Sequence, residues 1–164
     1  FQVYKVAGIS HINMIDELIH EENIKTDALI EIVKAKKYPI TEYYGDPAGT
    51  QAQGQSGIGD IEMFRRSGII IKSVRDKASR SKASGESHVR GFIESADGSR
   101  RFHINESCAG IQEDLESLRY PDSTGDLKPE SLKDGYHDHG CDMIRYFFIN
   151  RFPIKNREVR VIKR

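Results

Sequence analysis

The clearest helical pattern in the sequence spans residues 138–151 and reads Asp138-His139-Gly140-Cys141-Asp142-Met143-Ile144-Arg145-Tyr146-Phe147-Phe148-Ile149-Asn150-Arg151. Its apolar side chains recur at helical spacing and form one stripe, made of Cys141, Ile144, Phe147 and Phe148. Asp138 is a favourable N-cap residue, and Pro153 ends the helix because proline cannot continue it. The stretch therefore predicts a helix of about residues 138–151 with one apolar side.

The residues before this helix alternate between strand and helix patterns. Alternating polar and apolar residues predict two strands, 2–7 and 9–15, joined by a tight turn at Gly8. Helical spacing predicts helices at 26–37, 60–67 and 111–118 and around Val89, Phe92 and Ile93, and short apolar or β-rich runs predict strands at 40–45, 69–71 and 101–104. A hairpin followed by alternating helices and strands indicates an α/β fold, a sheet flanked by helices.

The length of the chain, 164 residues, suits one core of ordinary size. We expect residues 1–153 to form a single domain and residues 154–164 to be a basic C-terminal tail. The chain begins at Phe1 rather than Met, on a predicted strand, and we interpret it as part of a longer protein. Two cysteines suit a reducing compartment, and no apolar run approaches the roughly 20 residues that span a bilayer, which predicts a cytoplasmic protein without a membrane partner.

Charge is balanced over the whole chain, with 25 basic and 25 acidic residues, but it is uneven along it. Residues 61–104 contain ten basic side chains against five acidic ones. Within this region the polar stretch with Arg75, Lys77, Arg80 and Lys82 has no apolar period, which indicates an exposed loop or a frayed helix. These four side chains are candidates for contact with DNA phosphates, and a solvated loop without a ligand is the alternative.

Asp46 is the first candidate for chemistry. It directly follows a predicted strand, in the turn sequence Gly45-Asp46-Pro47-Ala48-Gly49. Proteins of the α/β class place reactive groups at the carboxyl ends of strands, so we expect Asp46 to be a metal ligand. The alternative is that Asp46 only shapes an Asp-Pro turn.

The first turn of the last helix supplies the other candidates. Asp138 and Asp142 are separated by four residues, so their carboxylates face the same side of the helix, and His139 lies three residues before Asp142. Like charges on one side repel unless a cation, a proton or a basic neighbour offsets them. A divalent metal ion would do so. Helix capping is the alternative, with Asp138 as the N-cap and Asp142 favoured by the helix dipole.

The donor types indicate which metal such a site would take. Carboxylates with a single imidazole favour Mg²⁺ or Mn²⁺, and carboxylate pairs of this kind serve two-metal phosphoryl transfer. Zinc is the alternative, because His137, His139 and Cys141 offer imidazole and thiolate ligands. The His-x-His-x-Asp-His pattern typical of the metallo-β-lactamase fold is incomplete, since Cys141 and Asp142 stand where Asp and His belong.

Two further acids, Asp16 and Glu17, end the second strand of the hairpin. They would add a carboxylate to the site, or they are ordinary solvated residues at a strand end.

The glycines between Gly54 and Gly59 lack the Gly-Lys-Ser/Thr pattern of a phosphate loop, so the sequence does not support an NTPase site.

Taken together, these segments resemble the nuclease domain of the large terminase subunit of tailed bacteriophages, a member of the ribonuclease-H-like superfamily. They are Tyr43-Tyr44-Gly45-Asp46-Pro47-Ala48-Gly49 and Tyr136-His137-Asp138-His139-Gly140-Cys141-Asp142-Met143-Ile144-Arg145-Tyr146, preceded by Ile15-Asp16-Glu17-Leu18. The Asp-His-x-x-Asp-x-x-Arg-Tyr helix is the most specific part, and the resemblance spans nearly the whole chain. It implies a ribonuclease-H-like mixed β-sheet flanked by helices, and Mg²⁺- or Mn²⁺-dependent cutting of double-stranded DNA concatemers during genome packaging.

The resemblance also implies roles for residues and partners. Asp46 and Asp142 would be catalytic metal carboxylates, with Asp138 and His139 completing or tuning the site. The family's first catalytic aspartate lies on a strand before the hairpin, and no acidic residue precedes Asp16 in this sequence. The implied partners are double-stranded DNA, the terminase ATPase domain, the small terminase subunit and the portal. The implied location is the host cytoplasm, for a phage or prophage protein.

Three functions are open at this point. The first is a metal-dependent DNA endonuclease that uses these carboxylates. The second is a ribonuclease-H-like junction resolvase, which would use the same carboxylates on branched DNA. The third is a non-catalytic domain that contacts DNA or the packaging motor, which would bind DNA in a salt-sensitive manner without cutting it.

Overall fold

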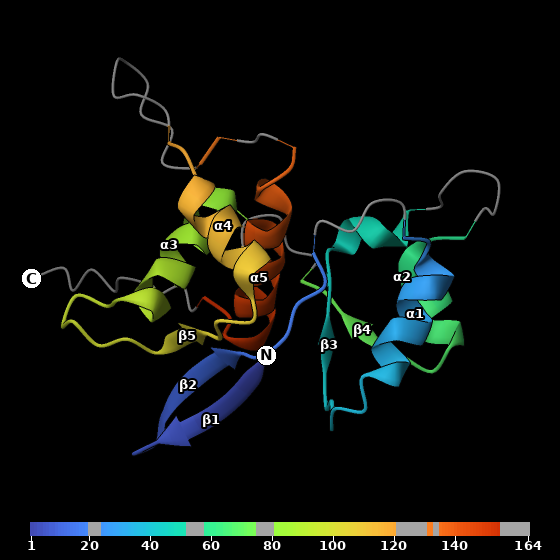
Figure 1. The fold of residues 1–164 in the computed structure, drawn as a ribbon, viewed down its shortest axis with the longest axis horizontal. Coiled ribbons are helices and arrows are strands. Elements are labelled where there is room, and N and C mark those ends of the chain that lie inside the picture. The colour runs from blue at the N-terminus through green and yellow to red at the C-terminus, as the bar shows by residue number, and fades with distance from the viewer. Residues whose placement is uncertain (20–23, 52–57, 75–80, 121–130, 133–134, 155–164) are drawn as a thin grey trace, which may run out of the picture.

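The computed structural model describes residues 1–19, 24–51, 58–74, 81–120, 131–132 and 135–154 (Figure 1). These residues form a mixed α/β fold with five α-helices and two small β-sheets. In chain order the elements are β1 (Gln2–Val6), β2 (Ile9–Met14), α1 (Thr26–Ala35), β3 (Tyr43–Tyr44), the 3-10 helix η1 (Pro47–Thr50), α2 (Asp60–Arg66), β4 (Ile71–Lys72), α3 (Lys82–Ile93), β5 (Phe102–Ile104), α4 (Ala109–Ser117) and α5 (Asp138–Arg151).

The predicted hairpin opens the first sheet. Strands β1 and β2 pair antiparallel, and the two turn residues, Ala7 (φ 49°) and Gly8 (φ 81°), both have positive φ. Two positive φ values match the right-handed twist of the strands on either side, which is why such turns prefer glycine. Strand β5 then pairs with β2 in parallel, with Ile12 opposite Phe102, so the sheet has the order β1-β2-β5.

Helix α5 fills the centre of the core, and its predicted bounds are confirmed. Phe148 is fully buried, and its ring lies 4.7 Å from Phe92 of α3 and 5.1 Å from Phe102 of β5. Ile144, one turn earlier, is 1% exposed. Cys141 is only half-buried, so the predicted apolar stripe holds for three of its four members. The helix therefore packs against both α3 and the first sheet.

The second sheet consists of β3 and β4, which pair in parallel. Both strands have two residues, so the predicted strand 40–45 is shorter than expected. The prediction of a buried strand at 69–71 was wrong, because Ile70 is 61% exposed and β4 begins at Ile71. Ile69 is buried for another reason: it follows Gly68 (φ 89°), and its backbone N–H donates to the Phe64 carbonyl at the end of α2 (2.9 Å). Together with the bond from the Gly68 N–H to the Arg65 carbonyl (3.1 Å), this is the hydrogen-bond pattern of a helix that ends at a glycine.

The remaining predicted helices are confirmed with small shifts at their ends. Helix α3 begins at Lys82, where the Ser81 hydroxyl accepts a bond from the Ser84 N–H, and helix α4 begins at Ala109.

Several segments that the sequence analysis discussed lie outside the described residues. They are much of the predicted basic stretch (75–80), the loop 52–57, parts of the connection before α5 (121–130 and 133–134) and the tail from residue 155. Within the described part of the chain, no helix has both the length and the apolar character needed to cross a bilayer.

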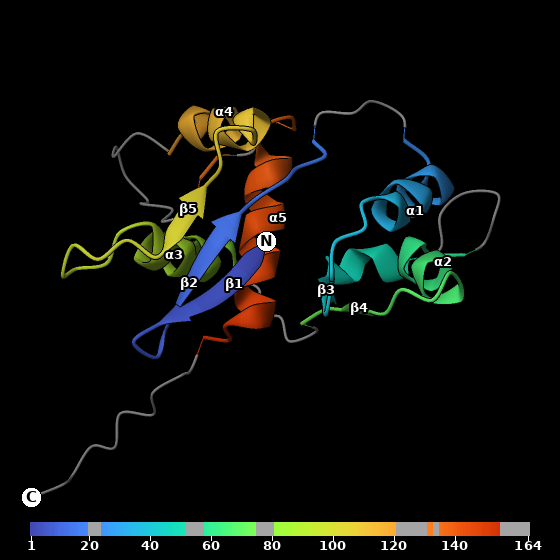
Figure 2. The same ribbon diagram turned by 60° about the horizontal axis from the view of Figure 1, so that its bottom comes forward.

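Helix α5 also joins the two sheets, and Figures 1 and 2 show it between them. The Phe147 ring stacks on Phe1, the residue before β1, with 3.9 Å between ring centroids. It also meets Tyr44 of β3 edge-on at 6.0 Å. One aromatic side chain of α5 therefore contacts the residue that precedes the first sheet and a residue of the second sheet.

If Phe148 anchors this core, its truncation will be costly. We expect Phe148→Ala to lower the free energy of unfolding by about 3–5 kcal/mol, the usual cost of emptying a buried phenylalanine site. Urea unfolding followed by circular dichroism measures the loss. As a control, Ile70→Ala should change stability by less than about 0.5 kcal/mol, because Ile70 is exposed. Equal stability of the two variants would contradict the placement of Phe148.

Candidate functional site

Asp46 lies where the sequence predicted, just after β3 and at the start of η1. The Gly45 N–H donates to the Lys72 carbonyl of β4 (3.1 Å), so the sheet pairing continues to the residue before Asp46. The Asp46 carboxylate accepts a hydrogen bond from the Ala48 N–H (2.9 Å) and so shapes the Asp-Pro turn. The turn interpretation is therefore correct, and it is compatible with a second role because a carboxylate accepts several bonds.

Tyr146 of α5 interacts with Asp46. Burial is the main cause that raises the pKa of Tyr146, the neighbouring Arg145 opposes the shift, and the nearby Asp46 carboxylate raises the pKa further. The Tyr146 side chain therefore lies close to Asp46, and its phenol is protonated at neutral pH.

Asp142 is held by the residue that precedes Tyr146. Both the Nε and the Nη2 atoms of Arg145 donate to Asp142 Oδ1, at 3.1 and 2.8 Å. The Arg145 side chain is 6% exposed and that of Asp142 is 22% exposed, so the pair lies largely out of water. The guanidinium also stacks over the Tyr146 ring at 4.4 Å. Asp46 and Asp142, far apart in sequence, are thus linked through two adjacent residues of α5.

Asp138 and His139 lie in other surroundings than Asp46 and Asp142. Asp138 is 6% exposed, and its Oδ1 accepts a bond from the N–H of Gly135 (2.8 Å). The prediction that Asp138 caps the helix was wrong: the cap position is His137, and Asp138 instead reaches back to the turn at Gly135 (φ 78°), through which the chain enters α5. His139 is exposed. Among the described residues no three His, Cys, Asp or Glu side chains lie close enough to hold a metal ion together.

Cys141 bears on the zinc alternative. Burial raises the pKa of this thiol to about 12, with further contributions from the charges of Asp114 and Asp142. A zinc ligand must be a thiolate, so this environment disfavours the form that zinc would need. The oxygen donors Asp46 and Asp142 remain the better candidates.

Asp114 of α4 is a buried carboxylate that the sequence analysis missed. It is fully buried beside Gly140 on the first turn of α5, and a Cβ atom added at Gly140 would collide with its Oδ2 atom. A negative charge near the N-terminus of a helix is favoured by the helix dipole. The spacing of the sequence could have indicated that Asp114 is buried, since it lies three residues after Ile111 on the buried stripe of α4. Full burial keeps this carboxylate away from any substrate.

Asp16 and Glu17, the proposed extra carboxylates, are both engaged in the fold rather than solvated. The two carboxylate oxygens of Glu17 accept bonds from the N–H groups of Gly110 and Ile111, each at 2.9 Å, and so cap the first turn of α4. Asp16 forms an ion pair with Lys36 of the segment after α1. Each acid therefore has a structural task of its own.

Arg75, Lys77 and Arg80 lie outside the described residues, so only Lys82 of the predicted DNA-contacting set can be located. The Lys82 Nζ atom donates to the Ser131 carbonyl (2.9 Å) and lies 3.8 Å from Glu86. Its side chain is 14% exposed. Contact between this stretch and DNA stays a prediction.

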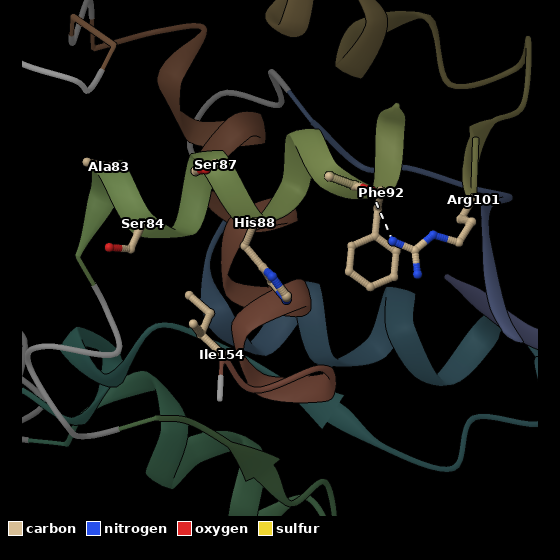
Figure 3. Close-up of a pocket in the computed structure, with 8 residues that line it drawn as sticks. Ala83, Ser84, Ser87, His88, Phe92, Arg101 and Ile154 are labelled. Atoms are coloured by element: carbon tan, nitrogen blue, oxygen red, sulfur yellow. Dashed lines mark hydrogen bonds between the residues drawn. The ribbon is translucent and has the colours of Figure 1, made fainter. Parts of the chain in front are cut away.

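A groove of about 720 Å³ runs along α3 (Figure 3). His88 contacts the Phe152 carbonyl (2.7 Å), and Arg101 donates to the Gly91 carbonyl (3.0 Å) while its guanidinium stacks on Phe92. Among the described residues that line the groove there is no carboxylate, so it is not our candidate for the metal site. The lining residues are Ala83, Ser84, Ser87, His88, Gly91, Phe92, Arg101 and Ile154.

Comparison of the chain with protein-family models, with curated proteins and with solved structures finds no match. The assignment of a function therefore rests on the geometry around α5 and on the resemblance of the motifs. Of the four predicted site residues, Asp46 and Asp142 are linked through α5, Asp138 is bonded to the turn before it, and His139 faces solvent.

The capping role of Glu17 can be tested directly. We expect Glu17→Ala to lower the free energy of unfolding by about 0.5–2 kcal/mol, the usual cost of losing a helix cap. Urea unfolding measures the change. The exposed acid Glu106, in the loop before α4, provides the control, and Glu106→Ala should be close to neutral. If Glu17→Ala were as stable as the unchanged chain, the cap would be unimportant.

The Asp16 pair predicts a dependence of stability on pH. The bond from Lys36, and then that from Tyr38, hold the pKa of Asp16 below its ordinary value of 3.8. A lowered folded-state pKa stabilises the fold above the ordinary pKa, and this stabilisation is lost as the pH falls below about 4. The stability difference between the unchanged chain and Asp16→Asn should therefore shrink from pH 5 to pH 2.5. A difference that stays constant over this range would argue against the pair.

Proposed function

We propose that this chain is a metal-dependent DNA endonuclease domain of the kind found in terminase large subunits of tailed bacteriophages. It would cut double-stranded concatemeric DNA by two-metal hydrolysis. One observation carries the proposal: Arg145 bonds to Asp142, and its neighbour Tyr146 lies close to Asp46. The two carboxylates that the motifs single out thus both neighbour the same pair of residues of α5.

The donor set fits Mg²⁺ or Mn²⁺. Magnesium is commonly held by one or two carboxylates and completes its coordination with water and substrate phosphates, so two aspartates are a sufficient protein contribution. When bound, such ions generate hydroxide and stabilise the leaving oxygen of the phosphodiester. Asp46 and Asp142 would hold the metals, and Asp138 and His139 of the same helix would tune the site. The basic stretch that includes Lys82 would steer the DNA backbone.

The arrangement of strands supports the ribonuclease-H-like form of this proposal. Within the described residues β1 pairs only with β2, and β3 only with β4, so each sheet ends in an edge strand. Both sheets contact the same helix, the first through Phe102 and Phe148 and the second through Tyr44 and Phe147. A strand inserted between β1 and β3 would join them into one mixed sheet. The resemblance assigns the family's first catalytic aspartate to a strand of this kind.

The partners follow from the same proposal. The substrate is double-stranded DNA, and the terminase ATPase domain, the small terminase subunit and the portal are the protein partners. The domain would act in the host cytoplasm, where the concatemers are packaged.

A non-catalytic role in DNA or motor contact is the second candidate, and one observation favours it. Asp16 and Glu17, the acids that were expected to add a carboxylate to the site, are engaged with Lys36 and with the N-terminus of α4. On this alternative the chain binds DNA with an affinity that falls as salt is raised, and it cuts no DNA at any concentration of divalent metal.

Plasmid cleavage in Mn²⁺ tests the proposal, and Asp46→Asn is the most informative variant. Asparagine still accepts the Ala48 N–H and so preserves the turn, but it removes the charge that a metal needs. We expect Asp46→Asn and Asp142→Asn each to lower the cleavage rate by about 100-fold or more, since metal catalysis contributes several kcal/mol to the barrier.

Asp97 provides a matched control for Asp46. Its carboxylate accepts the N–H of Ser99, two residues on (2.9 Å), which is the same turn bond that Asp46 makes with Ala48. Asp97→Asn should therefore cut plasmid at the rate of the unchanged chain. Cleavage by Asp46→Asn and Asp142→Asn at that same rate would remove both aspartates from the proposed site. A chain that binds DNA but does not cut it would favour the non-catalytic role.

A further inference from the structure

Arg145 is a buried cation in the wall of the proposed site. The residue is 5% exposed, although a guanidinium cannot lose its charge under ordinary conditions. A buried charge is tolerated only where partners compensate for the lost water. An arginine buried this deeply therefore needs specific partners. The structure provides two, the Asp142 carboxylate and the Tyr146 ring.

The contacts of Arg145 restrain the Asp142 carboxylate. Two nitrogens of the planar guanidinium donate to the same oxygen, Oδ1, at 3.1 and 2.8 Å. The guanidinium is itself held over the Tyr146 ring at 4.4 Å. The Tyr146 side chain also lies close to Asp46. Arg145 therefore fixes the orientation of the Asp142 carboxylate, and the ring that supports Arg145 neighbours the other proposed ligand.

Gly85 of α3 provides the room for this arrangement. A Cβ atom at position 85 would lie 2.6 Å from Arg145 Cγ and 2.7 Å from Cδ, closer than side-chain carbons approach. Glycine inside a helix weakens it, so its presence calls for a reason. Gly91 lies on the same helix, and a Cβ atom there would meet nothing within 4 Å. The need for glycine at position 85 is thus explained by the path of the Arg145 side chain.

We infer that Arg145, seated against Gly85 and supported by Tyr146, is the positioning residue that orients Asp142 for metal binding. This inference rests on the proposed function. Arg145 would touch neither the metal nor the DNA, and it would act only through Asp142 and Tyr146. Loss of a group that orients a metal ligand typically lowers metal affinity by about 10–100-fold.

Mn²⁺ affinity, measured by titration with the electron paramagnetic resonance signal of free Mn²⁺, tests the inference on the whole chain. We expect Arg145→Met to weaken binding by about 10–100-fold. Arg145→Lys keeps the charge but loses the two-pronged donor, so it should restore binding only in part. Tyr146→Phe keeps the ring under the guanidinium and removes only the hydroxyl. It should weaken binding while remaining folded, which keeps the test decisive if Arg145→Met does not fold.

Three variants of α3 separate positioning from general destabilisation. Gly85→Ala should weaken Mn²⁺ binding because it displaces Arg145, whereas Gly91→Ala should bind as the unchanged chain does. Val89→Ala removes a buried side chain of the same helix, so it should lower the melting temperature without changing Mn²⁺ affinity.

The outcomes distinguish the inference from the proposed function. If the unchanged chain binds Mn²⁺ and the Arg145, Tyr146 and Gly85 variants bind it equally well or more tightly, the inference is overturned and the proposed function stands. If Mn²⁺ affinity follows melting temperature across all variants, including Val89→Ala, Arg145 is merely structural and the inference is likewise overturned. If the unchanged chain does not bind Mn²⁺, the proposed function fails, and the inference fails with it.

Discussion

The Phe147 ring of α5 packs against two other rings, that of Phe1, the residue before the first sheet, and that of Tyr44 in the second sheet. Full burial of an aromatic side chain of this size contributes about 1.5–3 kcal/mol, and paired rings add further stabilisation. Tyr146 precedes Phe147 on the same helix, so the packing of one residue sets the position of the next. The closeness of Tyr146 to Asp46 therefore depends on how α5 sits between the sheets.

Close helix contacts fix α5 on its other sides. Gly85 lets the Arg145 side chain pass against α3, and Gly140 lets α5 approach Ile111 and Asp114 of α4. In both places a charged side chain occupies the space next to a glycine. Buried charges are costly unless they are compensated, and here they lie beside the helix that carries the proposed metal ligand Asp142. Stability and the proposed site thus depend on the same helix contacts.

Local patterns predicted the parts of the structure that local forces decide. The α5 bounds followed from its apolar spacing, and the first hairpin followed from alternation around Gly8. Long-range contacts could not be predicted from such local patterns. Glu17 and Asp114 are ordinary acids in the sequence, and their tasks at the N-terminal turns of α4 and α5 arise only when distant elements meet.

The candidate site was likewise predictable only in the part that local sequence decides. Motif spacing identified Asp46 and Asp142, and the turn bond of Asp46 could be expected from its neighbours Pro47 and Ala48. The link between the two acids through Tyr146 and Arg145 could not be predicted from the sequence, because it requires β3 and α5 to be placed together in three dimensions. Capping by Asp138 was mispredicted because the path of the chain into α5 depends on the turn at Gly135.

The central claim is that Asp46 and Asp142 belong to one metal site. Anomalous diffraction from a crystal of the chain soaked in Mn²⁺ tests it most directly, since the signal locates the ion without assumptions about catalysis. The account predicts manganese peaks at coordination distance from the carboxylates of both Asp46 and Asp142. Peaks that contact neither aspartate, or manganese bound instead at His139 and Cys141, would contradict it.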